Sequence, residues 1–140
     1  MSAEKLYSEI FEEFDKAKNK QERLAVLRKY DHPRFREFLN CAFNPHIKFD
    51  VEIPPYRPAI EPAGLNSTYL STEVVKFYRF IEGHPQRPAG LSDLKKKQLL
   101  TVILESLHKD EAELLCKLIK RDIGVKYLKL NLVLEAFPGI

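Results

Sequence analysis

The sequence predicts an all-α domain of about six or seven helices, crossed by one extended, proline-rich segment. Apolar side chains recur at helical spacing along most of the chain, and capping or turn residues separate those stretches. Five prolines fall within the 21 residues 44–64, where they forbid a helix and a central strand. The 140 residues fit one domain, so we expect a single domain over residues 1–140.

Three helices are predicted before the proline-rich segment. The first covers residues 2–17, and the second covers residues 20–29 with Asn19 as its N-cap. The third follows Asp31, its predicted N-cap, and has Pro33 in its first turn. The apolar side chains expected to face the core are Leu6, Ile10, Phe14, Ala17, Leu24, Leu27, Phe35, Phe38, Leu39 and Ala42.

Residues 44–68 are predicted to form an ordered, extended connector that lies over the helices. Alternating apolar residues indicate an extended chain: Ile47, Phe49, Val51 and Ile53. The apolar content is too high for a free linker, so we expect these side chains to pack on the domain.

Three more helices are predicted after the connector. One begins near Ser71, one runs from a cap at Ser92 or Asp93 to Leu107, and one covers residues 111–122 behind a cap at Asp110. Gly124 is expected to end the last of these in the left-handed conformation. The apolar residues expected to face the core are Val74, Val75, Phe77, Tyr78, Ile81, Leu99, Leu100, Ile103 and Leu107.

The last segment is ambiguous from its residues alone. "KLNLVL" alternates like a strand, whereas a helical stripe is formed by Leu130, Val133, Leu134 and Phe137.

Composition narrows the class of protein. Apolar residues make up 44% of the chain and charged residues 31%, as in an ordinary globular protein, and the apolar runs are too short for a membrane span. The acidic, amphipathic N-terminus does not resemble a secretion signal. Cys41 and Cys116 stand in apolar surroundings, which predicts buried free thiols and a reducing, cytoplasmic location.

The sequence shows no catalytic constellation. It has no glycine-rich phosphate loop, no nucleophile elbow and no HExxH motif. The four histidines are scattered without ligand spacing, and neighbouring carboxylates such as Asp110 and Glu111 are typical of a solvated face or a helix start. We therefore expect no enzyme activity, no metal and no cofactor.

Positive charge is concentrated in the second half, around one turn. Residues 1–70 hold 11 Lys or Arg and 11 Asp or Glu, whereas residues 71–140 hold 12 and 9. Lys117, Lys120 and Arg121 share the helix face opposite the leucines, and Lys126 follows Gly124. Cations in a helix's last turn also favour its dipole, so a solvated helix end explains most of this pattern equally well.

Lysines at two predicted helix starts are not explained by cations in a helix's last turn. Lys126 would start the next helix, where a cation opposes the dipole and no capping side chain precedes it. A cation triplet, Lys95, Lys96 and Lys97, occupies the first turn of its own predicted helix. Backbone N–H groups at helix starts with nearby cations are typical of phosphate sites.

The C-terminal 30 residues resemble the end of the N-terminal DNA-binding domain of ATP-dependent DNA ligases, above all those of T4-like phages. The matching features are an acidic helix start, a Leu-Leu pair, an Arg-Asp before a turn glycine, and a closing aromatic-Pro-Gly. They fall on Glu111, Glu113, Leu114, Leu115, Arg121, Asp122, Gly124, Phe137, Pro138 and Gly139. The upstream order is similar as well, with a short helix, a proline-rich crossing and a helix like "VVKFYRFIE".

The resemblance implies an all-helical domain that holds duplex DNA by its backbone, without reading sequence. It also implies that the final segment is a helix. The adenylation motif Lys-x-Asp-Gly of the ligases is missing, and Val125 and Lys126 stand where the family has a small hydroxyl residue after the glycine. The expected function is a non-catalytic, phage-encoded double-stranded DNA-binding protein in replication or repair. The candidate DNA-binding residues are Arg57, Lys95, Lys96, Lys97, Lys117, Lys120, Arg121, Gly124 and Lys126.

A helical protein-interaction module is the alternative. If residues 126–136 form a helix, Leu128, Leu132 and Ala136 make a second apolar face that could bind a phage or host protein. The connector of residues 44–68 could equally cover that face. Convergence of the named basic side chains on one face would favour DNA, and scatter would favour the interaction module.

Overall fold

A computed structural model describes residues 5–63 and 65–139 of the chain. Within them the fold is all-helical, as predicted, and an isolated antiparallel bridge between Phe49 and Ile81 is the only extended pairing. The helices are α1 (Tyr7–Lys16), α2 (Lys20–Lys29), α3 (Pro33–Phe43), α4 (Leu70–Glu73), the 3₁₀ helix η1 (Val74–Phe80), α5 (Asp93–Ser106), α6 (Lys109–Ile119) and α7 (Leu130–Ala136).

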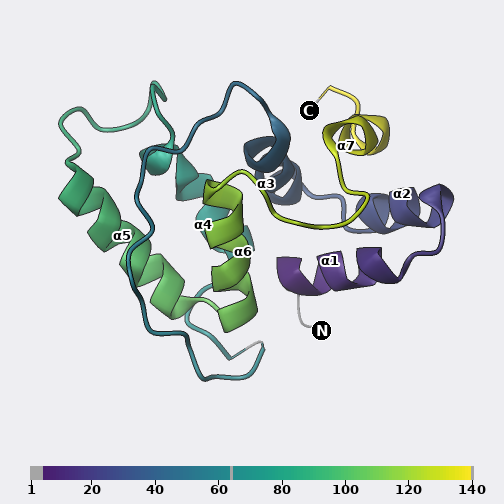
Figure 1. Cartoon of the computed structure of the whole chain (residues 1–140), viewed down its shortest axis with the longest axis horizontal. Coiled ribbons are helices and arrows are strands. Elements are labelled where there is room, and N and C mark those ends of the chain that lie inside the picture. Colours follow the sequence, from purple (N-terminus) through teal and green to yellow (C-terminus); the bar gives the residue numbers. More distant parts are fainter. Residues whose placement is uncertain (1–4, 64, 140) are drawn as a thin grey trace.

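The helices form two hairpins joined by α3 and α4. Figure 1 shows α1 and α2 side by side on the right and α5 and α6 on the left, and each of these pairs packs together. α7 returns to pack on α2, and α6 also packs on α1 and α3. One continuous core joins all of these elements among the described residues.

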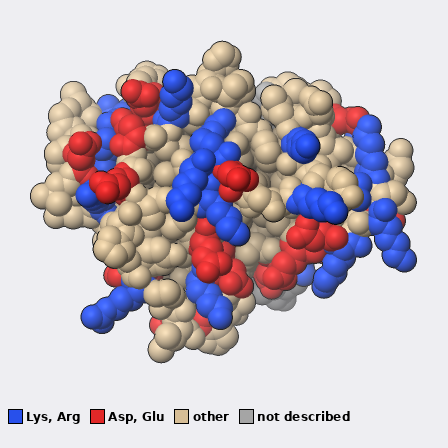
Figure 2. Space-filling view, viewed as in Figure 1, with Lys and Arg blue, Asp and Glu red and all other residues tan. Residues whose placement is uncertain are grey.

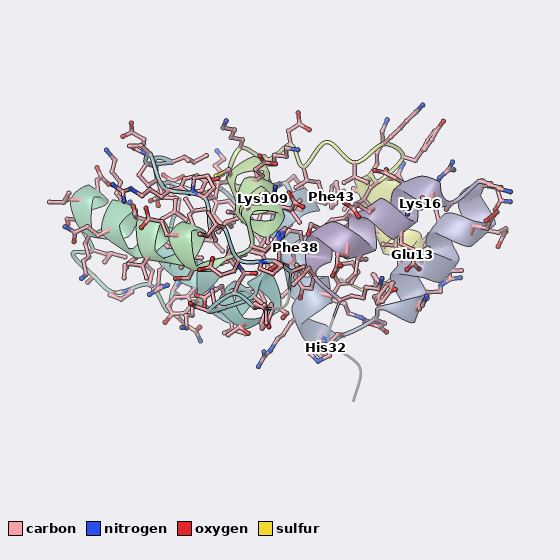
Figure 3. All side chains as sticks on the ribbon, turned by 90° about the horizontal axis from the view of Figure 1, so that it is seen from below. Glu13, Lys16, His32, Phe38, Phe43 and Lys109 are labelled. Atoms are coloured by element: carbon pink, nitrogen blue, oxygen red, sulfur yellow. The ribbon has the colours of Figure 1, made fainter. Side chains whose placement is uncertain are left out.

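Aromatic side chains fill the centre of this core. Phe38 is fully buried and lies near the middle of the molecule in Figure 3. Tyr7 contacts both Phe35 and Phe38 edge-on, at ring separations of 5.3 and 5.0 Å. Phe137 reaches the same cluster, because its ring lies 6.5 Å from that of Phe35. The aromatic residue of the closing Phe-Pro-Gly is therefore part of the core.

The starts of the first three helices match the prediction in part. Asn19 caps α2 as predicted and accepts a hydrogen bond from the Glu22 amide at 2.9 Å. α1 begins at Tyr7, later than predicted, and residues 2–4 of the predicted helix lie outside the described residues. His32 caps α3, so the prediction of Asp31 was wrong.

Asp31 is engaged elsewhere, because its carboxylate pairs with the Arg36 guanidinium at 2.7 Å. The His32 ring takes the capping role by accepting from the Arg34 amide at 3.1 Å. His108 does the same at the start of α6, accepting from the Asp110 amide at 3.1 Å, and it replaces the predicted Asp110 cap. His32 and His108 therefore act as N-caps of α3 and α6.

The proline-rich segment crosses the helices as an extended chain, as predicted. It is held to the end of η1 by two backbone hydrogen bonds, from the Asp50 amide to the Phe80 carbonyl (2.9 Å) and from the Glu82 amide to the Lys48 carbonyl (2.8 Å). In Figure 1 the segment passes across α5. The Arg57 amide donates to the Glu105 carboxylate of α5 at 2.9 Å, which fixes the far end of that crossing.

The helix predicted from Ser71 is a short α-helix followed by a 3₁₀ helix. A 3₁₀ helix has three residues per turn, so its buried positions repeat every third residue: Val74, Phe77 and Phe80. The prediction used the α-helical period, and it was therefore wrong about Val75, whose side chain is 52% exposed.

Candidate nucleic-acid interface

The left-handed residue that ends α6 is Arg121. The prediction that Gly124 takes this place was wrong. α6 ends at Ile119, and Arg121 adopts the left-handed conformation with φ of 63°. Its amide donates to the Leu118 carbonyl at 2.9 Å, and the Asp122 amide donates to the Lys117 carbonyl at 3.0 Å. This pair of bonds is a Schellman motif, in which glycine is the usual left-handed residue. Gly124 is also left-handed, at φ of 67°, but it lies in the loop beyond the cap.

The Arg121 side chain holds the end of α3. Its guanidinium donates to the backbone carbonyls of Cys41 and Asn44, two acceptors at the C-terminus of that helix. The last carbonyl groups of a helix have no hydrogen-bond partners within the helix. A cation at this end also interacts favourably with the negative end of the helix dipole. Partial burial lowers the pKa of the Arg121 guanidinium below its usual value. The prediction that Arg121 lies on the helix face opposite the leucines, beside Lys117 and Lys120, was wrong, because the side chain reaches back to α3.

The lysines at the start of α5 diverge. Ser92 caps the helix by accepting from the Lys95 amide at 3.1 Å, so no phosphate is needed there. Lys96 is only 3% exposed, and its ammonium lies 3.2 Å from Asp50 and 3.1 Å from Asp93. Lys97 pairs with Glu52 at 2.9 Å. Lys96 is thus too deeply buried to contact a phosphate. Of the three lysines, Lys95 is the one that is exposed and has no ion-pair partner among the described residues.

Lys96 belongs to a small, partly buried ion cluster. Asp50 also accepts from the Arg87 guanidinium at 2.6 Å, and the Lys96 ammonium donates to the Asp50 carbonyl at 2.9 Å. Burial alone would raise the pKa of Asp50, but the hydrogen bonds from Arg87 and Lys96 outweigh it and hold that pKa below its usual value. The cluster fastens the extended connector to α5, which is a structural role.

Lys117 and Lys120 are exposed near the end of α6, as predicted, but their surroundings differ. Lys117 lines a groove between α1 and α6 with four carboxylates, those of Glu12, Asp15, Asp110 and Glu113. Figure 2 shows both signs of charge on this face, with basic side chains gathered over its centre and acidic ones below them. The carboxylates weaken the field of Lys117, whereas Lys120 does not line that groove. Lys120 is therefore the better placed of the two for an anion.

The loop between α6 and α7 carries an exposed aromatic side chain with two cations. Tyr127 is 52% exposed and left-handed, with φ of 69°. The Arg23 guanidinium of α2 lies 3.9 Å from the centre of its ring, and the Lys126 ammonium lies 5.0 Å from it. Lys126 is exposed but precedes α7 by a turn, because α7 begins at Leu130, so the predicted helix-start site at Lys126 was wrong.

The predicted apolar interaction face is part of the core. Leu128 and Ala136 are 4% and 7% exposed, and Leu132 packs against the same core. α7 itself packs on α2, so this face is turned into the molecule and is not free for a partner. An apolar groove lies instead between the end of α3 and the outer side of α7. Its lining includes Leu39, Phe43, Pro45, Leu130, Val133 and Leu134.

Three important residues were missed by the sequence reasoning. Arg23 lies in the half with no net charge, and Tyr127 gives no periodic signal because it stands in a loop. Glu111 is 1% exposed and accepts from the Tyr7 amide at 2.9 Å and the Leu70 amide at 3.1 Å, so one carboxylate serves the starts of α1 and α4. An acidic residue in a first turn usually serves its own helix, so no local pattern indicates this bridge.

The described residues offer few other chemical sites. No group of three or more His, Cys, Asp or Glu side chains among them could hold a metal ion. Cys41 is buried and Cys116 half-buried, both as free thiols, and burial raises the pKa of each. None of the described helices is long and apolar enough to cross a membrane. Arg57 is exposed on the connector, where only its backbone amide is engaged with Glu105.

Comparison with known proteins gives one match. The model of a family of unknown function, DUF6433, matches residues 10–125. The chain belongs to this family. The DUF6433 match includes α2 to α6 and most of α1, together with the turn residues as far as Val125. Searches of curated proteins and of solved structures find no match. None of these findings bears on ligase DNA-binding domains, so that resemblance stays a prediction.

Proposed function

We propose that this DUF6433 member is a non-catalytic protein that binds the phosphate backbone of duplex DNA without reading its sequence. The observation that carries the proposal is the group of cations around the α6–α7 loop. Lys120 and Lys126 are exposed, and no carboxylate of the described residues pairs with either of them or with Arg23. Exposed cations without carboxylate partners, two of them beside the same ring, are the kind of electrostatic footprint that backbone binding uses.

The resemblance to ligase DNA-binding domains supports the same proposal. It falls on the segment from Glu111 to Gly139, which contains this loop. The surface is smaller than the sequence predicted, because Lys96 and Arg121 serve the fold and Lys97 is paired with Glu52. We assign the main contacts to Lys120, Lys126 and Arg23. Peripheral contacts would come from Lys117, Lys95 and Arg57.

Fluorescence anisotropy on two unrelated labelled duplexes tests the proposal. Three to six phosphate contacts predict non-specific binding, with a dissociation constant that rises with salt at a logarithmic slope of about 3 to 5. The two duplexes should give the same curve. The double variant Lys120→Gln/Lys126→Gln should bind more weakly than Lys5→Gln/Lys109→Gln, which changes net charge equally at other exposed positions. Absence of binding at about 50 mM salt, or equal affinity of the two double variants, rejects the proposal.

A protein partner is the second candidate, favoured by the apolar groove between α3 and α7. Leu134 is 39% exposed at its edge, whereas Leu39 and Val133 in its lining are buried in the core. Such a groove can receive one or two apolar side chains of a partner. Leu134→Glu would then abolish capture of the partner while DNA binding stays unchanged. Capture that depends on Lys120 and Lys126 and not on Leu134 would count against this candidate.

A further inference from the structure

The cations of α2 are engaged in two different ways. Lys20 pairs with the Glu135 carboxylate at 2.8 Å, and Lys29 pairs with that of Glu13 at 3.1 Å. Arg28 donates to the Glu135 carbonyl at 3.3 Å. Arg23 is the exception among these four, because its partner in the described structure is the face of the Tyr127 ring. Its donor groups are therefore not committed to an oxygen acceptor of the described residues.

The Tyr127 backbone explains how the ring reaches Arg23. A positive φ is uncommon for a residue with a side chain and is kept only where the surroundings enforce it. Leu128 provides that restraint, because its side chain is buried and its amide donates to the Val125 carbonyl at 3.1 Å. The half-exposed ring itself is not held by burial. The fold thus fixes a strained backbone and presents an aromatic ring at the surface.

The ring brings two cations close together. Arg23 and Lys126 lie 3.9 and 5.0 Å from its centre, so their charges are at most about 9 Å apart, which is the sum of those two distances. Cation–π contacts restrict where each charge can go without using its hydrogen-bond donors. Two like charges within about 9 Å of each other, neither paired with a carboxylate of the described residues, make a local positive patch that suits phosphate groups.

We propose that Arg23, Tyr127 and Lys126 together form a phosphodiester-binding site for one strand of duplex DNA, in which the ring positions both cations. This inference rests on the proposed function and adds to it a residue from α2 and an aromatic residue. Adjacent phosphates of one strand are separated by about 3.4 Å along the helix axis, so the two cations can contact one phosphate or two neighbours. Tyr127 acts by positioning, since its own side chain carries no charge.

The test separates the charge of the site from the role of the ring. We would measure duplex affinity at about 50 mM salt, and its salt slope, for Arg23→Gln, Lys126→Gln, Tyr127→Phe and Tyr127→Gly. Lys109→Gln is the matched control, because Lys109 is exposed at the start of α6 and lies outside the site. Glycine accepts the positive φ at residue 127 without strain, so Tyr127→Gly removes the ring and spares the backbone.

Loss of Arg23 or Lys126 should weaken binding about tenfold at this salt and lower the slope by about one unit. Tyr127→Phe keeps the ring and should bind within about twofold of the wild type. Tyr127→Gly should lose about three- to fivefold in affinity with no change in net charge. Circular dichroism melting of each variant establishes that it is folded at the measuring temperature.

Two different failures are distinguishable. If the wild-type protein does not bind duplex DNA, the proposed function is rejected and this site with it. If the wild type binds but Arg23→Gln equals Lys109→Gln, or Tyr127→Gly equals Tyr127→Phe, the site is rejected while backbone binding through other lysines stands.

Discussion

Removing the charge of Glu111 should destabilise the fold more than any other single carboxylate-to-amide change considered for this chain. The Glu111 side chain is 1% exposed, and its two oxygens accept from the amides of Tyr7 and Leu70 at 2.9 and 3.1 Å. These amides open α1 and α4, which lie 104 and 41 residues away in the sequence. The carboxylate thus joins three helices by two charge-assisted hydrogen bonds.

The substitution Glu111→Gln keeps the size of the side chain and removes one of its two acceptors. The amide NH₂ group would face a backbone N–H, and that donor would be left buried without its acceptor. Loss of one charged hydrogen bond and weakening of the other should cost about 2–4 kcal/mol of unfolding free energy. For a domain of this size that corresponds to a fall in Tm of about 6–12 °C.

Urea unfolding of Glu111→Gln beside Glu113→Gln measures this effect. Glu113 lies on the exposed side of the same helix, so its replacement should change the unfolding free energy by less than about 0.5 kcal/mol. Equal unfolding midpoints for the two variants would mean that the two interhelix bonds contribute nothing measurable, and the reasoning would be refuted.

Three further predictions concern residues whose role follows from the structure. Arg121→Gly suits the left-handed backbone but loses both bonds to α3, so it should lower the unfolding free energy by about 2 kcal/mol in the same urea assay, and a stable variant would contradict the capping role. Lys96→Met should cost about 1–3 kcal/mol, because the partly buried Asp50 loses the ammonium and keeps Arg87 alone, whereas Lys95→Met should change little; equal effects would refute the burial argument. The pKa of Asp50 is lower in the folded protein than in the unfolded chain, so its ionised form stabilises the fold. This stabilisation is complete above the unfolded-state pKa of about 3.9 and is lost as the pH falls through the folded-state pKa. Asp50→Asn should therefore show a smaller drop in urea midpoint from pH 6 to pH 3 than the wild type does.

Local signals account for most of the helices. Asn19 and Ser92 cap their helices as predicted, because an N-cap bond spans only three residues and depends on nothing outside the helix start. The proline-rich segment was also predictable, since proline excludes helix wherever the rest of the chain lies. The 3₁₀ helix was missed because both helix types have similar apolar spacing over a few residues, and they differ here in Val75, which is exposed, and Tyr78, which is only partly buried.

The candidate site was predicted less well, because a lysine's environment is set by distant residues. Lys95 and Lys96 are adjacent in the sequence, yet Lys96 turns toward Asp50 on the connector and is buried. A helical wheel places Arg121 on the exposed side of the helix. The helix ends before Arg121, however, and its side chain donates hydrogen bonds to the end of α3. The pairing of Arg23 with Tyr127 joins residues about a hundred positions apart, which no local pattern encodes.

Chemical-shift mapping with duplex DNA tests the central claim most directly. Isotope-labelled protein would be titrated at low salt with a short duplex while backbone and arginine side-chain signals are followed. Our account predicts that the largest shifts fall on residues 120–127 and on Arg23, with little change at Lys96 or Lys109. Shifts confined to the groove between α3 and α7, or no shifts at all, would contradict it.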